Sequence, residues 1–205
     1  MTISIVIPTY NDNYYLNKLI KDILNQNYPH NDIELIIVEA GKNNEKDLLK
    51  LISDSGIKLK YEHRFKLSRN KSLNLGFKLS KNDLIVRLDA RTHIPKNYLI
   101  EIEKLSNSVN CTNVGGVKVP IGETVKQKFL SKIMSNPFCL GGAKFRQRDY
   151  EGYADTVYLG CYKRKEVQNN FFFDEKYDGI SEDADFNFKL TKSGHQTYIS
   201  SKIKV

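Results

Sequence analysis

Short runs of apolar and β-branched residues alternate with segments of helical periodicity over the first 119 residues of this chain. Strands are expected at residues 3–7, 33–38, 57–61, 84–88 and 114–119. Between them, leucine and isoleucine recur every three or four positions, as on the buried face of a helix. This alternation predicts βαβ units, and therefore an α/β fold with a Rossmann-like, mainly parallel sheet flanked by helices.

The remainder of the chain has a less regular pattern. Helices are expected at residues 125–134 and 181–192 and a strand at 157–162, and residues 202–205 lie within or just after a strand-like segment. No linker, repeat or low-complexity tract divides the 205 residues, a length that suits one domain. We therefore expect one domain, with a nucleotide-type half at about residues 1–119 and a variable half at about residues 120–205.

The charge of the chain favours anionic partners, because 32 lysine and arginine residues against 24 aspartate and glutamate residues give a formal net charge of +8. The basic residues are scattered, without an RNA-binding aromatic motif or zinc-finger spacing, so a nucleic acid partner is not expected. The three cysteines form no C-x-x-C pair, and neither a secretory leader nor an apolar run of membrane-spanning length is visible. These features predict a cytoplasmic protein with reduced thiols.

Three of the expected strands end at residues that a ligand could contact, namely Pro8, Glu39 and Asp89. In parallel sheets ligands bind beyond the carboxyl ends of the strands, so these residues should converge on one site. Arg91 occupies the position where a second carboxylate would complete a D-x-D metal clamp. Taken alone, Asp89 could equally start a turn or cap the helix near Pro95.

Short motifs in a fixed order along the chain carry a resemblance to a known family. They lie at residues 5–11 (IVIPTYN), 28–29 (YP), 36–39 (IIVE), 69–70 (RN), 74–76 (NLG), 88–90 (LDA), 173–175 (FDE) and 182–185 (EDAD). This ordered set resembles the family 2 glycosyltransferases, which have the GT-A fold. The segments 87–90 (RLDA), 141–146 (GGAKFR), 155–157 (DTV) and 160–164 (GCYKR) are similar to the glucosyltransferase type of succinoglycan and related exopolysaccharide synthesis.

The resemblance implies a nucleotide-sugar site at the first strand ends. Pro8, Tyr10 and Glu39 would contact the uracil and ribose, although the family usually has aspartate where Glu39 stands and often a second aspartate at Ala40. Arg69 would lie near the nucleotide or its diphosphate. The alternatives are a half-buried packing role for Tyr10 and an ordinary surface position for Arg69.

The resemblance also implies a divalent cation at the diphosphate. Asp89 can bind Mg²⁺ or Mn²⁺ through a carboxylate oxygen, whereas Arg91 cannot bind a cation. His93 is close enough in sequence to be a second ligand, although a lone histidine is more often a surface residue. Arg91 could instead place its own positive charge on the diphosphate.

The pair Glu182 and Asp183 opens the helix expected after the FDE turn. The resemblance implies an inverting single displacement in which Asp183 is the general base and Glu182 its helper or a ligand of the acceptor hydroxyl. Two acids at the start of a helix can also be simple complements of its dipole, stabilising it by about 0.3–1 kcal/mol each.

A glycine pair followed by basic residues, Gly141, Gly142, Lys144 and Arg146, is expected to form an acceptor or phosphate loop, or else a solvated surface loop. The implied reaction moves a sugar from a nucleotide-diphosphate sugar, with UDP favoured, to a saccharide or lipid-linked acceptor in exopolysaccharide or capsule synthesis. The first half of the chain would bind the nucleotide, and the second half would bind the acceptor and supply the base.

Members of this type usually continue into amphipathic or membrane-spanning helices. We therefore expect either a truncated chain or a minimal domain, located at the inner face of the plasma membrane, where the +8 charge suits an anionic surface. One rival is a non-catalytic nucleotide-sugar-binding module, in which the lost second aspartate marks a decayed enzyme. A nucleotidyltransferase is the other rival, but it would show a glycine-rich basic loop after the first strand, where this chain has Pro8-Thr9-Tyr10-Asn11.

Overall fold

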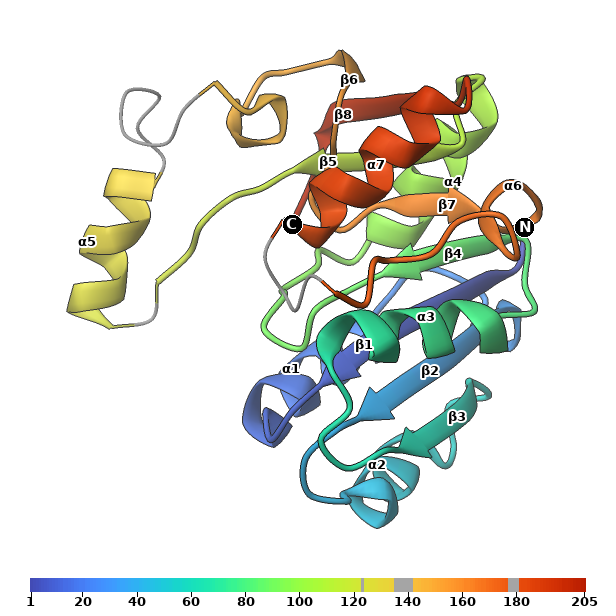
Figure 1. The fold of residues 1–205 in the computed structure, drawn as a ribbon. Helices are drawn as coiled ribbons and strands as arrows, with labels where there is room; N and C mark the ends of the chain where they lie inside the picture. Colours follow the sequence, from blue (N-terminus) through green and yellow to red (C-terminus); the bar gives the residue numbers. More distant parts are fainter. Residues whose placement is uncertain (123, 135–141, 177–180) are drawn as a thin grey trace.

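The computed structural model describes residues 1–122, 124–134, 142–176 and 181–205. Its described strands form one mixed sheet of eight strands in the order β3-β2-β1-β4-β7-β5-β8-β6, with helices on both faces (Figure 1). The expected α/β fold with a mainly parallel sheet flanked by helices is confirmed.

The first half of the chain forms the parallel part of the sheet. Its strands are β1 (Ile3–Thr9), β2 (Ile33–Glu39), β3 (Lys58–His63) and β4 (Leu84–Arg87), and its helices are α1 (Asn13–Leu24), α2 (Glu45–Ile52) and α3 (Arg69–Leu79). Every residue of β1 and β2 is buried, as expected for parallel strands that are covered on both faces. The sequence expectations for these elements agree with the structure to within a few residues at each end.

Side chains alternate between the two faces of the sheet. Ile5 and Leu35 belong to the larger core cluster, which α1, α2 and α4 (Tyr98–Ser108) also enter, whereas Val6 and Ile36 belong to a second cluster with α3 and α7 (Glu182–Lys192). Gly76 of α3 permits the close approach of that helix to β1, because a Cβ atom there would lie 2.3 Å from Cγ1 of Val6.

The second half adds β5 (Asn113–Val117), β6 (Gly152–Ala154), β7 (Cys161–Lys163) and β8 (Thr197–Lys204) to the sheet. β7 lies antiparallel between β4 and β5, and β8 runs parallel to β5. The short helix α6 (Arg164–Val167) follows β7, the helix α5 (Val125–Met134) stands apart from the sheet, and residues His30–Asp32 and Lys144–Arg146 form single 3₁₀ turns.

One expected strand differs from the structure, because the run at residues 157–162 forms a strand only over Cys161–Lys163. Val157 is buried against Val117 and Ile199 without joining a ladder, and Leu159 is buried in the left-handed conformation, with φ of 55°. The residues before Cys161 are therefore apolar because they belong to a buried loop, and this apolar run resembled a strand in the sequence. β6 was not expected, because its sequence Gly-Tyr-Ala contains no apolar run.

The fold brings the carboxyl ends of several strands and the first turns of two helices to one edge of the sheet. β1, β2 and β4 are parallel and end at Thr9, Glu39 and Arg87, and the first turns of α3 and α7 begin close to the same edge (Figure 1). No helix within the described ranges is long and apolar enough to span a lipid bilayer.

Candidate active site

A cavity of about 500 Å³ opens at the carboxyl edge of the sheet, beyond the ends of β1 and β4 and beside the start of α3. Five of the residues expected at a nucleotide-sugar site line it together: Pro8, Tyr10, Arg69, Asp89 and Arg91. Tyr10 is exposed, which leaves its ring free to cover a flat ligand and argues against a half-buried packing role.

Glu39, also expected at the nucleotide site, is fully buried and does not line the cavity, although its neighbour Ala40 does. Its Oε1 accepts hydrogen bonds from the backbone N–H of Asn11 at 3.2 Å and from that of Gly41 at 2.5 Å, which ties the loop after β1 to the end of β2. Its Oε2 is buried without a hydrogen-bond partner among the described residues. A buried carboxylate oxygen without a partner costs free energy, so Glu39 is an unusual residue to find at this position.

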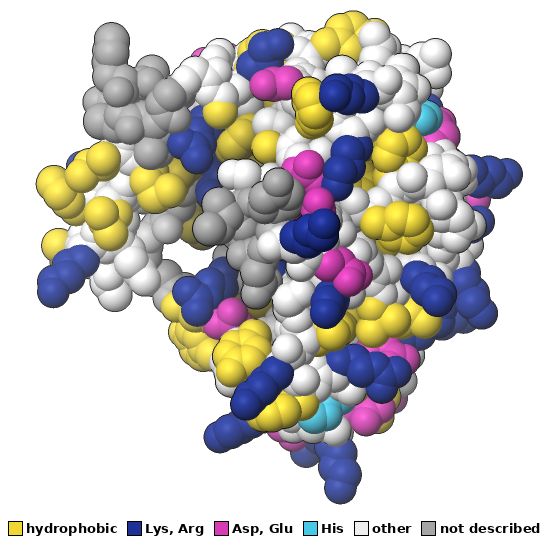
Figure 2. Space-filling view, viewed as in Figure 1, with side chains coloured by type: hydrophobic (Ala, Val, Ile, Leu, Met, Phe, Trp, Pro, Cys, Tyr) yellow, Lys and Arg dark blue, Asp and Glu magenta, His cyan; other side chains and the backbone are white. Residues whose placement is uncertain are grey.

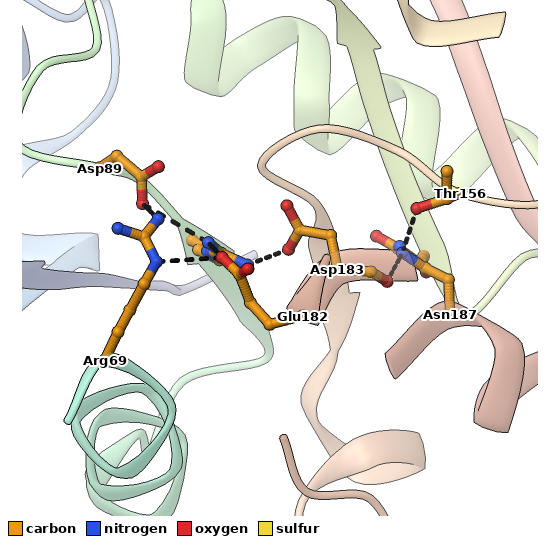
Figure 3. Close-up of polar contacts among 8 residues, drawn as sticks. Arg69, Asp89, Thr156, Glu182, Asp183 and Asn187 are labelled. Atoms are coloured by element: carbon orange, nitrogen blue, oxygen red, sulfur yellow. Dashed lines mark hydrogen bonds and ion pairs between the residues drawn. The ribbon is translucent and has the colours of Figure 1, made fainter. Parts of the chain in front are cut away.

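Charged side chains from α3, β4, α7 and the loop after β4 meet beside this cavity. Arg69, in the first turn of α3, donates to Oδ1 of Asp89 at 2.6 Å and to Oε1 of Glu182 at 3.0 Å (Figure 3). Arg87, the last residue of β4, donates to Oε1 of Glu182 at 2.7 Å and to Oδ1 of Asp183. The structure therefore joins Asp89 to the distant pair Glu182 and Asp183 through two guanidinium groups.

Arg87 is the site residue that sequence reasoning did not single out. Its side chain is 1% exposed, and its guanidinium lies 5.6 Å from the centre of the Phe173 ring. Burying a guanidinium costs several kcal/mol unless carboxylates pair with it. The sequence does carry one signal for this residue, because Arg87 is a charged residue inside the apolar run of residues 84–88. Such a residue predicts a buried partner of opposite charge but does not identify that partner.

The pKa of Glu182 lies below its ordinary value. Burial alone would raise this pKa, but the charge and hydrogen bond of Arg87, then a backbone hydrogen bond and the charge of Arg69, outweigh the burial and lower it. Glu182 is therefore held as a carboxylate between two guanidinium groups. Both acids do lie in the first turn of α7, yet their side chains bind arginines, so complementing the helix dipole is only part of their role.

The start of α7 is anchored from behind. The side-chain amide of Asn187 donates to the backbone carbonyl of Asp183 at 2.8 Å and to Oγ1 of Thr156 at 3.1 Å (Figure 3). Asn113 of β5 donates to Oδ1 of Asn187 at 2.6 Å. These buried amides fix the helix turn that presents Asp183.

Lys118 and Tyr158 were also missed by sequence reasoning. Tyr158 lines the cavity, and Nζ of Lys118 lies 4.2 Å from the centre of its ring. Burial and the charge of Arg146 lower the pKa of Lys118, and the charge of Asp89 opposes them. Both residues lie in segments that were expected to form strands, and only the tertiary structure shows that they meet beside the cavity.

Arg91 and His93 each pair with an acid of the α1 region. Arg91 lines the cavity and donates to Oδ1 of Asp12 at 2.8 and 3.1 Å. Nδ1 of His93 lies 2.6 Å from Oδ2 of Asp22, and His93 lines a different cavity from Asp89. The structure therefore does not place His93 with Asp89 as a ligand pair.

Asp89 is the one predicted metal ligand that faces the cavity. Among the described residues, no cluster of three or more histidine, cysteine, aspartate or glutamate side chains could hold a metal ion. Mg²⁺ is commonly held by one or two carboxylates together with substrate phosphates, so the donor chemistry of Asp89 fits a cation that a diphosphate also binds.

The predicted acceptor loop is only partly within the described residues, because Gly141 lies outside them. Gly142 is exposed, and Nζ of Lys144 donates to the backbone carbonyl of Tyr153 at 2.9 Å. The guanidinium of Arg146 lies 5.4 Å from the ring centre of Phe145. None of these three described residues lines the cavity with Asp89.

A mainly parallel sheet with helices on both faces and a charged cavity at its carboxyl edge is the arrangement of an α/β domain of the GT-A type. The family model described as Glycosyl transferase family 2 matches residues 4–171. The chain belongs to this family.

Two curated relatives illustrate the similarity. A protein of Methanococcus voltae, named dolichyl N-acetyl-alpha-D-glucosaminyl phosphate 3-beta-D-2,3-diacetamido-2,3-dideoxy-beta-D-glucuronosyltransferase, is 27% identical over 98% of this chain and 65% of its own length. The poly(ribitol-phosphate) beta-N-acetylglucosaminyltransferase TarP of Staphylococcus aureus (strain N315) is 31% identical over 43% of this chain and 28% of TarP.

Solved structures share the fold at low sequence identity. S. aureus TarS 1-349 in complex with UDP has a TM-score of 0.76 at 15% identity, over 100% of this chain and 60% of that one. The mannosyltransferase PcManGT from Pyrobaculum calidifontis, in complex with GDP-Man and Mn²⁺, has a TM-score of 0.71 at 14% identity, over 97% of this chain and 56% of that one. This chain spans 65% or less of each relative's length.

Proposed function

We propose that this chain transfers a sugar, with inversion at the anomeric carbon, from a UDP-sugar to a hydroxyl of a saccharide or lipid-linked acceptor. The observation that carries the proposal is the charged cluster beside the cavity, where Arg69 connects the diphosphate side, Asp89, to the proposed base side, Glu182 and Asp183. TarS structures in complex with UDP and with UDP-GlcNAc have the same fold, which supports a nucleotide sugar as the donor.

The nucleotide would occupy the β1 and β2 side of the cavity. The exposed ring of Tyr10 would cover the base, with Pro8 beside it. The buried Oε2 of Glu39 would accept a hydrogen bond from the base or the ribose, which would satisfy an oxygen that has no partner in the described structure. The first half of the chain thus binds the nucleotide, and the second half supplies the base.

The diphosphate would lie between Arg69, Asp89 and Arg91. Arg91 would exchange its bond with Asp12 for the diphosphate, and Asp89 would hold a Mg²⁺ or Mn²⁺ ion together with phosphate oxygens. When bound, such an ion stabilises the negative charge of the departing diphosphate. Arg69 contributes a fixed positive charge to the same end.

Asp183 would act as the general base. Its carboxylate takes the proton of the acceptor hydroxyl while the hydroxyl oxygen bonds to the anomeric carbon and the bond from that carbon to the diphosphate breaks. Figure 3 shows one Asp183 oxygen directed along the bond to a guanidinium nitrogen and the other directed away from it. Glu182, paired with Arg69 and Arg87, would hold Asp183 at a fixed position relative to the diphosphate site.

The test compares Asp183→Asn with Asp185→Asn, a matched change on the same helix at a residue that pairs with Lys189. Donor turnover and anomeric configuration would be followed by NMR with UDP-GlcNAc and other UDP-sugars. We expect Asp183→Asn to lower kcat by about 100- to 10,000-fold with little change in donor KM, and Asp185→Asn to stay within about threefold of wild type.

Near wild-type turnover by Asp183→Asn would refute the assignment of the base. Saturable binding of UDP-sugars without turnover of any acceptor would instead favour a non-catalytic nucleotide-sugar-binding module. We further propose that the reaction serves exopolysaccharide or capsule synthesis at the inner face of the plasma membrane, where lipid-linked acceptors are presented.

A further inference from the structure

Helix α5 exposes its apolar side chains to solvent. None of its ten residues, all within the described ranges, is buried, and Val125 and Phe129 expose 85% and 66% of their surface. Leu130, Ile133 and Met134 are exposed as well. By contrast, α1 and α4 each bury leucine and isoleucine against the sheet.

The apolar residues of α5 occupy one side of the helix. Val125, Phe129 and Ile133 recur at every fourth position, so they form a stripe that Leu130 and Met134 broaden. Figure 2 shows yellow side chains gathered on this helix, at the left of the molecule. A contiguous exposed apolar stripe in a folded domain marks an interaction surface.

Lysines accompany this stripe. Lys126, Lys128 and Lys132 lie on the same helix and are exposed, and α5 has no acidic residue. An apolar stripe with leucine and phenylalanine on a lysine-bearing helix is typical of helices that lie in the surface of an anionic bilayer. A second copy of this chain fits the charge less well, because a two-fold contact would bring the lysines of both copies together.

The helix also lies beside the candidate active site. Ile121 and Gln127 line a cavity of about 490 Å³ together with Ala90 and Arg91, which also line the proposed donor cavity. Lys18 and Lys21 of α1 line this second cavity as well. A surface bound to α5 would therefore lie next to the opening of the site.

We propose that α5 binds the surface of an anionic lipid bilayer through Val125, Phe129, Leu130 and Ile133, with Lys126, Lys128 and Lys132 contacting lipid headgroups. This binding assigns the proposed membrane location to a defined surface of the molecule, on the helix that also contributes Gln127 to the cavity beside the donor cavity. It does not require the proposed transfer activity, because the binding surface contains none of the proposed catalytic residues.

The test is cosedimentation of the chain with vesicles of phosphatidylcholine alone or of phosphatidylcholine and phosphatidylglycerol at 3:1. We expect binding to the anionic vesicles, weakened by 0.5 M NaCl. The triple variant Lys126→Gln, Lys128→Gln and Lys132→Gln should lose about 100-fold in affinity, since each lysine near such a surface contributes about a factor of five. Phe129→Gln with Leu130→Gln should lose at least about tenfold.

The matched control changes three exposed lysines elsewhere, Lys46→Gln, Lys50→Gln and Lys58→Gln, which lowers the net charge equally. It should keep at least about half of the wild-type affinity. Equal losses in the control and the α5 triple variant would overturn the proposal, because net charge alone would then explain the binding. The proposal would also be overturned if the chain did not bind vesicles but associated with itself, and if Phe129→Gln with Leu130→Gln abolished that association. The apolar face of α5 would then be assigned to contact with a second copy of the chain. Donor turnover is also measured without lipid. A chain that turns over the donor but does not bind vesicles contradicts only the membrane proposal, whereas a chain that binds vesicles without turnover contradicts only the proposed function.

Discussion

Replacing Arg87 with methionine tests whether the buried charge cluster holds the site together. Methionine fills most of the volume beside Phe173 but leaves Glu182 and Asp183 without their shared guanidinium. The Arg87 side chain is 1% exposed, against 9% for Glu182 and 19% for Asp183. Removing one partner of a buried ion pair costs about 3–5 kcal/mol, because the remaining charge is buried without compensation.

The lower end of that range applies here. Glu182 keeps its 3.0 Å contact with Arg69, and Asp183 is open enough to be hydrated. We therefore expect the free energy of unfolding to fall by about 3 kcal/mol. In urea, with a slope of about 2–3 kcal/mol per molar, this lowers the midpoint by about 1–1.5 M.

The matched control is Arg64→Met, which removes a guanidinium that is 58% exposed and lies 2.9 Å from Glu62. An exposed pair contributes about 0–1 kcal/mol, so this variant should shift the midpoint by less than about 0.5 M. The double variant Arg87→Met with Glu182→Gln should lose at least about 1 kcal/mol less free energy of unfolding than the sum of the losses in the two single variants. Equal midpoints for Arg87→Met and Arg64→Met would refute the buried-cluster argument.

Three further predictions concern pH, packing and the diphosphate. Because the folded-state pKa of Glu182 lies below its unfolded value of about 4.5, its contribution to stability is full above that pH and is lost as pH falls through the lowered pKa. The free energy of unfolding of Glu182→Gln should therefore change less on acidification, and an unchanged pH dependence would contradict the pairing. Gly76→Ala places a methyl group 2.3 Å from Val6 and should cost about 1–3 kcal/mol in thermal unfolding, whereas Gly142→Ala, with open space around its Cβ, should be nearly neutral. EDTA should lower but not abolish turnover by the wild type, since Arg91 would supply part of the positive charge at the diphosphate. In Arg91→Ala, EDTA should abolish turnover. Complete loss of wild-type turnover in EDTA, restored by Mn²⁺, would contradict this.

The parallel half of the fold could be predicted from the sequence because its signals are local. The mainly apolar, β-branched runs of β1, β2 and β4 are buried on both faces, and such a run between periodic helices has few other interpretations. The antiparallel insertion of β7 between β4 and β5 depends instead on contacts between distant segments. For the same reason, the apolar loop at residues 157–160 resembled a strand.

The candidate site was predictable where it depends on strand ends. Pro8, Tyr10 and Asp89 come together because parallel strands end at the same edge of the sheet. The partners of the charged groups were not predictable, since Arg87 and Glu182 are 95 positions apart, and Arg91 and Asp12 are 79 apart. Periodicity shows that a charge is buried but carries no information on which distant carboxylate pairs with it.

Titration of the chain with UDP by calorimetry tests the central claim most directly, namely that the cavity at the sheet edge binds a nucleotide diphosphate. We expect saturable binding at one site, weakened by at least about tenfold in Arg69→Gln, because a charge-assisted hydrogen bond is lost. Lys78→Gln, a charge removed from the last turn of the same helix, should bind UDP as the wild type does. Absence of saturable UDP binding, or equal affinities for wild type and Arg69→Gln, would contradict this account.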